Sequence, residues 1–311
     1  MKHPAASIII CTRNRNELLA QCLHSIARQA GVREVEVLVV DNYLPDHARP
    51  VVEGVAAPGF RYVHEPQLGL SYARNRGAAE AGAQWLCYID DDARMRPGYL
   101  ERLFWVLRNF DFDCFGGMYF AWHPFGKPDW LPESFGTKIP LRDEVGYISV
   151  PELSGGNFCV KKEALIQAGG FSTDFGMRGG NIAYGEEGVL QAKLLWKDCK
   201  LGFDPLLAVD HAVLPGKLKL SWQLRHWYAH GRDGRRIKGE HQLPEVLILL
   251  SKSMAGSLLK FPVCLLKLLR TSNYYWQNLV WDVYSPLFFR TGQIVGSIQS
   301  RHAGFHHHPL L

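Results

Sequence analysis

The feature that most constrains the fold is a repeated alternation of short, almost wholly apolar segments with amphipathic ones. Residues 7–11, 35–40 and 84–89 are the apolar segments. The stretch 16–30 carries its apolar residues on one helical face, and 71–81 is a second predicted helix. Apolar strands that alternate with such helices predict an α/β fold, in which helices cover both faces of a doubly wound sheet.

A fold of this kind needs a chain that can bury a large core. The chain has 311 residues, of which 47% are hydrophobic and 21% charged, so a disordered or collagen-like protein is excluded. Its seven cysteines lie far apart without a C-x-x-C pair, which predicts free thiols in a reducing compartment. The apolar stretch 5–11 is too short for a signal peptide, so we expect a cytoplasmic protein.

Polar residues follow the predicted strands where ligands of such sheets bind. Thr12 and Asp41 follow the first two strands, and Asp90, Asp91 and Asp92 follow the third. The carboxyl ends of parallel strands form one edge of a sheet, so we expect these side chains to lie close together. Three adjacent carboxylates repel one another unless a cation is present, and Mg²⁺ and Mn²⁺ prefer oxygen ligands. The alternative is a solvated acidic turn.

Two further positions could carry chemistry. Glu186 and Glu187 begin a predicted helix, whose N-terminus favours ionised carboxylates. A carboxylate there can act as a general base on a hydroxyl group, or it can merely cap the helix. His211 follows the strand-like run 206–209 and could bind a metal or serve a structural role.

Several motifs, taken in order, resemble the family 2 glycosyltransferases, which have the GT-A fold. The motifs lie at residues 7–15 (SIIICTRNR), 39–42 (VVDN), 69–77 (GLSYARNRG), 89–92 (IDDD), 155–157 (GGN), 185–187 (GEE) and 210–211 (DH). The similarity covers residues 5–240. It implies a GT-A sheet of mixed strand direction in a catalytic domain over residues 1–240.

The resemblance also implies an inverting transfer of a sugar from a nucleotide-sugar donor, assisted by Mg²⁺ or Mn²⁺ and by one carboxylate base. By this resemblance, nine residues would bind the nucleotide sugar: Thr12, Arg13, Arg15, Asp41, Arg74, Asn75, Asp90, Asp91 and Asn157. The metal ligands would be Asp92, Asp90 and His211. Asp92 would be the more direct ligand, with Asp90 nearer the ribose.

The chain departs from the family's usual Glu-Asp pair by having Glu186-Glu187. The second position is usually the base in this family. We therefore expect Glu187 to be the base, with Glu186 as the alternative. The extra methylene moves the carboxylate by about one bond length. This shift would change the rate of a reaction that depends on the position of the base, unless the backbone compensates.

Residues 241–311 predict an amphipathic helical extension that associates with a membrane. Eleven basic residues against three acidic ones lie between residues 217 and 270. Lys252, Lys260, Lys267 and Arg270 fall within an arc of about 80° on a helix. No uninterrupted apolar stretch approaches the ~18 residues of a spanning helix, so we expect an interfacial helix. The alternative is a helix that packs on the catalytic domain.

These features together predict the partners of the protein. We expect a UDP-linked donor and an acceptor that is a saccharide or a polyprenyl-diphosphate-linked saccharide, in cell-surface polysaccharide synthesis. The protein would be peripheral on the cytoplasmic face of the inner membrane. Direct transfer to a polyprenyl phosphate and nucleotidyl transfer are the alternatives. No nucleic-acid partner is expected, because an apolar helix follows the basic segment.

Overall fold

The chain divides into two compact units, each built from separate segments. The computed structural model describes residues 4–55, 57–179, 181–238 and 243–302. Unit 1 comprises Met1–Trp122, Gly136–Gly179 and Glu186–Ala212, and unit 2 comprises His123–Phe135, Gly180–Gly185 and Val213–Leu311. This division by packing differs from the predicted domain boundary after residue 240, which stays a prediction.

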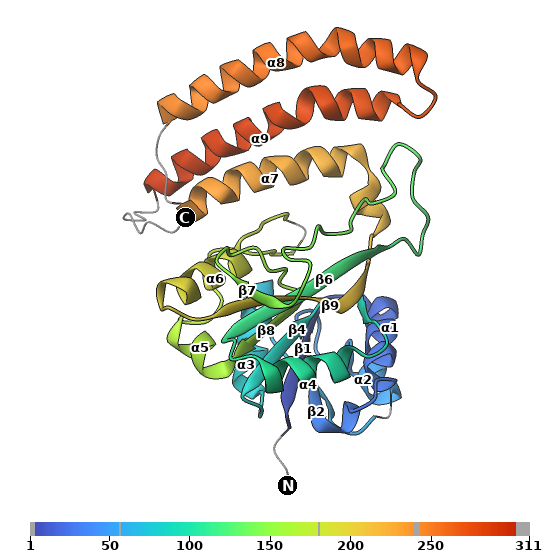
Figure 1. The fold of residues 1–311 in the computed structure, drawn as a ribbon, viewed down its shortest axis with the longest axis vertical. Helices are drawn as coiled ribbons and strands as arrows, with labels where there is room; N and C mark the ends of the chain where they lie inside the picture. The colour runs from blue at the N-terminus through green and yellow to red at the C-terminus, as the bar shows by residue number, and fades with distance from the viewer. Residues whose placement is uncertain (1–3, 56, 180, 239–242, 303–311) are drawn as a thin grey trace. The chain divides into compact units, whose positions relative to one another are not determined.

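Unit 1 contains a nine-stranded mixed sheet, with the order β3-β2-β1-β4-β8-β6-β9-β5 and with β7 paired to β9 (Figure 1). Strands β1 to β4 pair in parallel, whereas β8 runs antiparallel to β4 and β6. The strands are β1 (Ala6–Thr12), β2 (Val35–Asp41), β3 (Phe60–His64), β4 (Trp85–Ile89), β5 (Ala93–Met95), β6 (Cys114–Trp122), β7 (Gly146–Ile148), β8 (Asn157–Lys161) and β9 (Leu201–Ala212). The predicted mixed sheet is confirmed.

Helices cover both faces of this sheet, because successive side chains of a buried strand point to opposite sides. Ile8 and Ile10 of β1 pack with α1 (Asn16–Ala27), α2 (Arg49–Gly54) and α4 (Tyr99–Asn109). Ile9, between them, packs with α3 (Leu70–Glu80), α5 (Lys162–Gln167) and α6 (Glu186–Trp196). A strand with two buried faces needs apolar residues throughout, which explains the continuous apolar segments of the sequence.

The sheet brings the predicted strand-end residues to one edge. Thr12 pairs in register with Asp41, because β1 and β2 are parallel over seven residues. β4 lies on the other side of β1 and is followed directly by Asp90. β5, which begins one residue after Asp92, pairs with β9 so that Ala93 faces His211.

Unit 2 contains three long helices, α7 (Leu220–Lys238), α8 (Leu243–Arg270) and α9 (Trp276–His302), with α9 between the other two (Figure 1). A short 3₁₀ helix, Pro215–Leu218, precedes α7. Glycines allow the backbones of α7 and α9 to touch. A Cβ at Gly231 would overlap the carbonyl of Phe289, and one at Gly292 would overlap the carbonyl of Tyr228.

We expect Gly292→Leu to lower the free energy of unfolding by about 2–3 kcal/mol, because the side chain would force α7 and α9 apart. Chemical denaturation followed by circular dichroism measures this loss. Gly256→Leu is the matched control, since a Cβ there meets nothing within 4 Å and leucine favours a helix more than glycine does. Equal stability of the two variants would contradict the close helix contact.

Candidate active site

Two aspartates and a histidine form a group that could hold a metal ion. One ligand atom from each of Asp90, Asp92 and His211 lies within 4.8 Å of the others. Nε2 of His211 is 3.2 Å from Oδ1 of Asp92, and the hydroxyl of Tyr119 donates a 2.7 Å hydrogen bond to Oδ2 of Asp90. Two carboxylates and an imidazole are a donor set that suits Mn²⁺ or Mg²⁺.

Asp91, between the two candidate ligands, is held by the first strand and the loop after it. The hydroxyl of Thr12 donates to Oδ2 of Asp91 at 2.8 Å. Nη1 of Arg15 donates to Oδ1 of Asp91 at 3.0 Å and to Oδ2 of Asp92 at 3.1 Å. Burial raises the pKa of Asp91 to about 6, although the charge of Arg15 opposes the rise. Arg15 therefore stabilises the ionised form of a buried carboxyl group.

A second guanidinium, that of Arg74, links Glu186, one of the two candidate general bases, to the aspartates. Nη1 of Arg74, on α3, donates to Oε1 of Glu186 at 2.9 Å, and both side chains are buried. Nη2 of Arg74 lies 3.9 Å from Oδ1 of Asp90. A Cβ at Gly155 would overlap this guanidinium, and one at Gly156 would overlap the Asp90 carboxylate. The glycine pair therefore lets the backbone approach these two side chains closely.

The two neighbouring glutamates have different surroundings. Burial raises the pKa of Glu186 to about 8, the charge of Glu187 adds to the rise, and Arg74 opposes it. Glu186 is buried whereas Glu187 is half-buried. Among the described residues, Oε2 of each glutamate is buried without a hydrogen-bond partner. Such oxygens can accept a hydrogen bond from a bound hydroxyl group.

Two other residues that are predicted to bind the nucleotide sugar, Asp41 and Asn75, form hydrogen bonds within the protein. Asp41 is fully buried and accepts hydrogen bonds from the backbone N–H groups of Tyr43 and Ala48. The amide of Asn75 both donates to and accepts from the backbone of Phe171, at 2.9 Å each way. These contacts favour roles in holding loops, and a direct contact of Asp41 or Asn75 with a donor stays a prediction.

Asn157 is also fully buried, and its side-chain amide makes three hydrogen bonds within the protein. It accepts a hydrogen bond from the hydroxyl of Tyr99 and donates to the carbonyls of Met118 and Leu207. This geometry favours a role in tying β8 to β6 and β9 over contact with a sugar.

By contrast, Arg13 is exposed, with its guanidinium 5.5 Å from the ring centroid of Tyr43.

Tyr119 is the site residue that sequence reasoning missed. Besides its hydrogen bond to Asp90, its ring centroid lies 4.8 Å from that of His211. It stands in the apolar strand β6, within no recognisable motif. The order of strands in the sheet brings it next to Asp90, which follows β4, and next to His211 on β9, so no signal in the sequence marked it.

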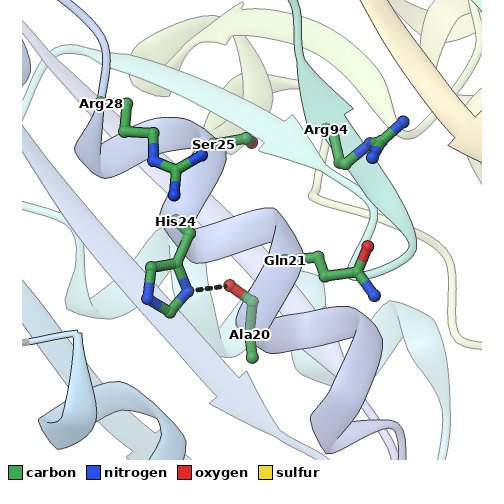
Figure 2. Close-up of a pocket in the computed structure, with 6 residues that line it drawn as sticks. All are labelled: Ala20, Gln21, His24, Ser25, Arg28 and Arg94. Carbon is green, nitrogen blue, oxygen red and sulfur yellow. Dashed lines mark hydrogen bonds between the residues drawn. The ribbon is translucent and has the colours of Figure 1, made fainter.

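The acidic edge is separate from a depression of about 500 Å³ on unit 1. Figure 2 shows this depression, lined by Ala20, Gln21, His24, Ser25, Arg28 and Arg94. These side chains come from α1, from Arg28 directly after it, and from β5, and none is among the predicted site residues. The candidate active site therefore rests on the linked carboxylates and arginines, because they combine metal-ligand chemistry with a possible base.

The fold and these residues define a glycosyltransferase of the GT-A class. The chain belongs to glycosyl transferase family 2, because the family profile of that description matches residues 7–169, more than half of the chain. This confirms the family predicted from the motifs.

Two named relatives match most of the chain. The succinoglycan biosynthesis protein ExoM of Rhizobium meliloti is 31% identical over 253 residues, which are 74% of this chain and 74% of that protein. The glucosyl-dolichyl phosphate glucuronosyltransferase of Haloferax volcanii is 26% identical over 238 residues, 74% of this chain and 76% of that protein. A match to the EpsH protein of Bacillus subtilis, 27% identical, spans only 33% of this chain and 30% of that protein.

Solved structures confirm the GT-A fold. The mannosyltransferase PcManGT from Pyrobaculum calidifontis, in complex with GDP-Man and Mn²⁺, has a TM-score of 0.56 at 16% identity and covers 100% of this chain and 78% of its own. GalNAc-T7 with UDP, GalNAc and Mn²⁺ has a TM-score of 0.55 at 17% identity, over 74% of this chain and 48% of its own.

The free energy of unfolding should fall as the pH rises from about 5 to about 8.5, and Glu186→Gln should remove much of that fall. The pKa of Glu186 is about 8 in the folded protein, against about 4.3 in an unfolded chain. The folded state thus binds the extra proton at low pH and loses that advantage as the pH rises through 8. Urea denaturation at several pH values measures the effect. Glu163→Gln, on an exposed part of α5, is the control. The same pH dependence in both variants would contradict the raised pKa.

Proposed function

We propose that the enzyme transfers a sugar, with inversion, from a UDP-linked donor to a hydroxyl group of a saccharide or a lipid-linked saccharide. The observation that carries this proposal is the linked set of acidic groups on unit 1. Asp90 lies close to Asp92 and His211, and Arg74 links Asp90 to the Glu186 carboxylate. The ligands named in two similar structures, GDP-Man in one and UDP with GalNAc in the other, each with Mn²⁺, support a nucleotide-sugar donor.

On the donor side, the residues of this chain would bind a metal and a diphosphate. Asp90, Asp92 and His211 would hold Mn²⁺ or Mg²⁺, since their ligand atoms are close enough together. When bound, such an ion stabilises the negative charge that develops on the departing diphosphate. Arg13 and Arg15, in the loop after β1, would donate hydrogen bonds to phosphate oxygens.

On the acceptor side, Glu187 would be the base. A carboxylate within hydrogen-bond reach removes the proton from the acceptor hydroxyl as its oxygen attacks the anomeric carbon. The oxygen attacks on the face opposite the nucleoside diphosphate, and a single displacement inverts the configuration. Glu186 is less suited to this role, because its carboxylate is buried against Arg74. It would instead hold Arg74 between the base and the metal ligands.

Glu187→Gln should lower kcat by about 10²- to 10⁴-fold, because the amide cannot accept the proton. Binding of UDP with Mn²⁺ should change little. Asp92→Ala should abolish both metal-dependent binding and transfer. The release of UDP during transfer, together with UDP titrations, measures these effects. Glu163→Gln is again a surface control. A folded Glu187→Gln variant that transfers sugar at the wild-type rate would disprove the assignment of the base.

The acceptor class rests on different support. The Haloferax relative is named for a glucosyl-dolichyl phosphate, and ExoM is named for succinoglycan biosynthesis. Both names favour a growing saccharide, and the first favours one carried on a lipid. Direct transfer to a polyprenyl phosphate stays the alternative, which product analysis with the two acceptors would distinguish. Membership of family 2 disfavours the predicted alternative of nucleotidyl transfer.

We also propose that the protein binds the cytoplasmic face of the inner membrane through α8. Of the ten large apolar residues that are exposed in the described part of α8, nine lie within an arc of about 160°. The four basic residues lie beside that arc, and the tenth apolar residue, Val263, lies among them. The nine are Leu247, Ile248, Met254, Leu258, Leu259, Phe261, Leu265, Leu266 and Leu269. A broad apolar face beside a basic stripe suits the surface of an anionic bilayer.

The packing of α8 favours an orientation in the plane of the membrane. Within Pro244–Arg270, an 18-residue window has a mean hydropathy of 1.5 and is 11% buried, so by length and composition the helix could also span a bilayer. Charged residues interrupt this window, so the prediction that no uninterrupted apolar stretch approaches a spanning length is not contradicted. However, α9 packs beside α8, with the Ser257 hydroxyl bonded to the Val283 carbonyl. A spanning α8 would take Asp282 and Arg290 of α9 into the hydrocarbon, which is costly.

Vesicle flotation of the full chain tests the membrane proposal. The wild-type protein should float with anionic phosphatidylglycerol vesicles. The double variant Leu258→Glu, Leu269→Glu should bind about 100-fold or more weakly, because two leucines that the bilayer would bury are lost. The matched control replaces two exposed apolar residues of unit 1, Ile139→Glu and Ile166→Glu. If this control weakened binding equally, or if the wild-type protein did not float, α8 would not be the membrane-binding element.

A further inference from the structure

We infer that Arg15 serves as an internal counter-cation of the acidic site, which a divalent metal must displace, so that metal and donor bind cooperatively. This inference rests on the proposed function, because it concerns the same metal and the same donor. It adds a role that a simple phosphate-binding arginine would not have. In the donor-free protein, Arg15 would weaken metal binding.

The geometry of Arg15 is the first support. A single nitrogen, Nη1, lies 3.0 Å from Asp91 and 3.1 Å from Asp92. The two aspartate side chains are 5% and 3% exposed, whereas the Arg15 side chain is 36% exposed. The carboxylates are thus fixed inside the unit, and the guanidinium reaches them from the surface. A side chain in this position can leave without the aspartates moving.

The sharing of Asp92 is the second support. Its Oδ1 is next to His211, and its Oδ2 accepts the hydrogen bond from Arg15. Asp92 is also one of the three residues that could hold a metal. A divalent cation bound to this carboxylate would lie close to the positive charge of Arg15, and the two would repel each other in a partly buried site. Metal binding should therefore be weaker while Arg15 remains there.

A reason for Arg15 to remain there is the cost of unpaired buried charge. Asp91 and Asp92 are adjacent buried carboxylates, and their contacts include Thr12 and His211 as well as Arg15. Such charges destabilise a fold strongly unless they are paired. Arg15 supplies the pairing before the metal arrives. The same guanidinium geometry fits phosphate oxygens, so a bound diphosphate offers Arg15 a new partner.

These two exchanges make metal and donor binding interdependent. A diphosphate that draws Arg15 away from Asp92 removes the positive charge that repels the metal. By thermodynamic linkage, the metal must then strengthen diphosphate binding by the same factor. The consequence is a site that loads fully only when both ligands are present.

The test is Mn²⁺ binding to the purified full chain, measured by the electron paramagnetic resonance signal of free Mn²⁺, without nucleotide and with UDP. Arg15→Gln should bind Mn²⁺ about tenfold more tightly than the wild-type protein when nucleotide is absent. It should also show a smaller increase in Mn²⁺ affinity when UDP is added. Arg15→Lys, which keeps the charge, should bind Mn²⁺ as the wild-type protein does. Arg13→Gln removes a nearby charge without carboxylate contact and should leave nucleotide-free Mn²⁺ affinity unchanged.

The outcomes separate the inference from the function on which it rests. If folded Arg15→Gln binds Mn²⁺ no more tightly than the wild-type protein, the inference about Arg15 is wrong while the metal site stands. If Arg13→Gln tightens Mn²⁺ binding equally, the effect is one of general charge and the inference is again wrong. If the wild-type protein binds no Mn²⁺ with or without UDP, the proposed function itself fails. Thermal melting of each variant verifies that it is folded.

Discussion

The pairing of buried negative charge with arginine is the interaction on which the acidic site depends. Carboxylates gather where the parallel strands end, and a buried carboxylate is tolerated only beside a cation or hydrogen-bond donors. Arg15 provides the positive charge for Asp91 and Asp92, and Arg74 provides it for Glu186. The elements that carry the two arginines are thus joined to the acidic edge by charge as well as by apolar packing.

The arrangement also explains how neighbouring carboxylates can differ in chemistry. Glu186 and Glu187 follow each other in the chain, yet only the first is buried against a guanidinium. Burial and mutual repulsion raise the pKa of Glu186, so its proton is held near neutral pH. Glu187 is closer to solvent and keeps an oxygen with no donor among the described side chains. Two residues of one type can therefore take different roles in one site.

Much of the fold and part of the site followed from local patterns. Continuous apolar strands predicted the doubly wound sheet, and polar residues after them predicted the edge where Asp90 and Asp92 meet His211. The detailed partners of Asn157 did not follow, because hydrogen bonds to backbone groups far along the chain leave no local signal. Tyr119 was missed for the same reason, since it reaches Asp90 only through the order of strands in the sheet.

The sequence by itself determined the strand and helix order, the residues available for metal binding, and the basic stripe of α8, because each depends on spacing along the chain. Tertiary structure alone decided which carboxylate pairs with which arginine and which face of α8 stays uncovered. Those outcomes depend on burial and on contacts between residues distant in sequence. An ionisable side chain acquires its charge state and its partners only when the folded chain removes it from water.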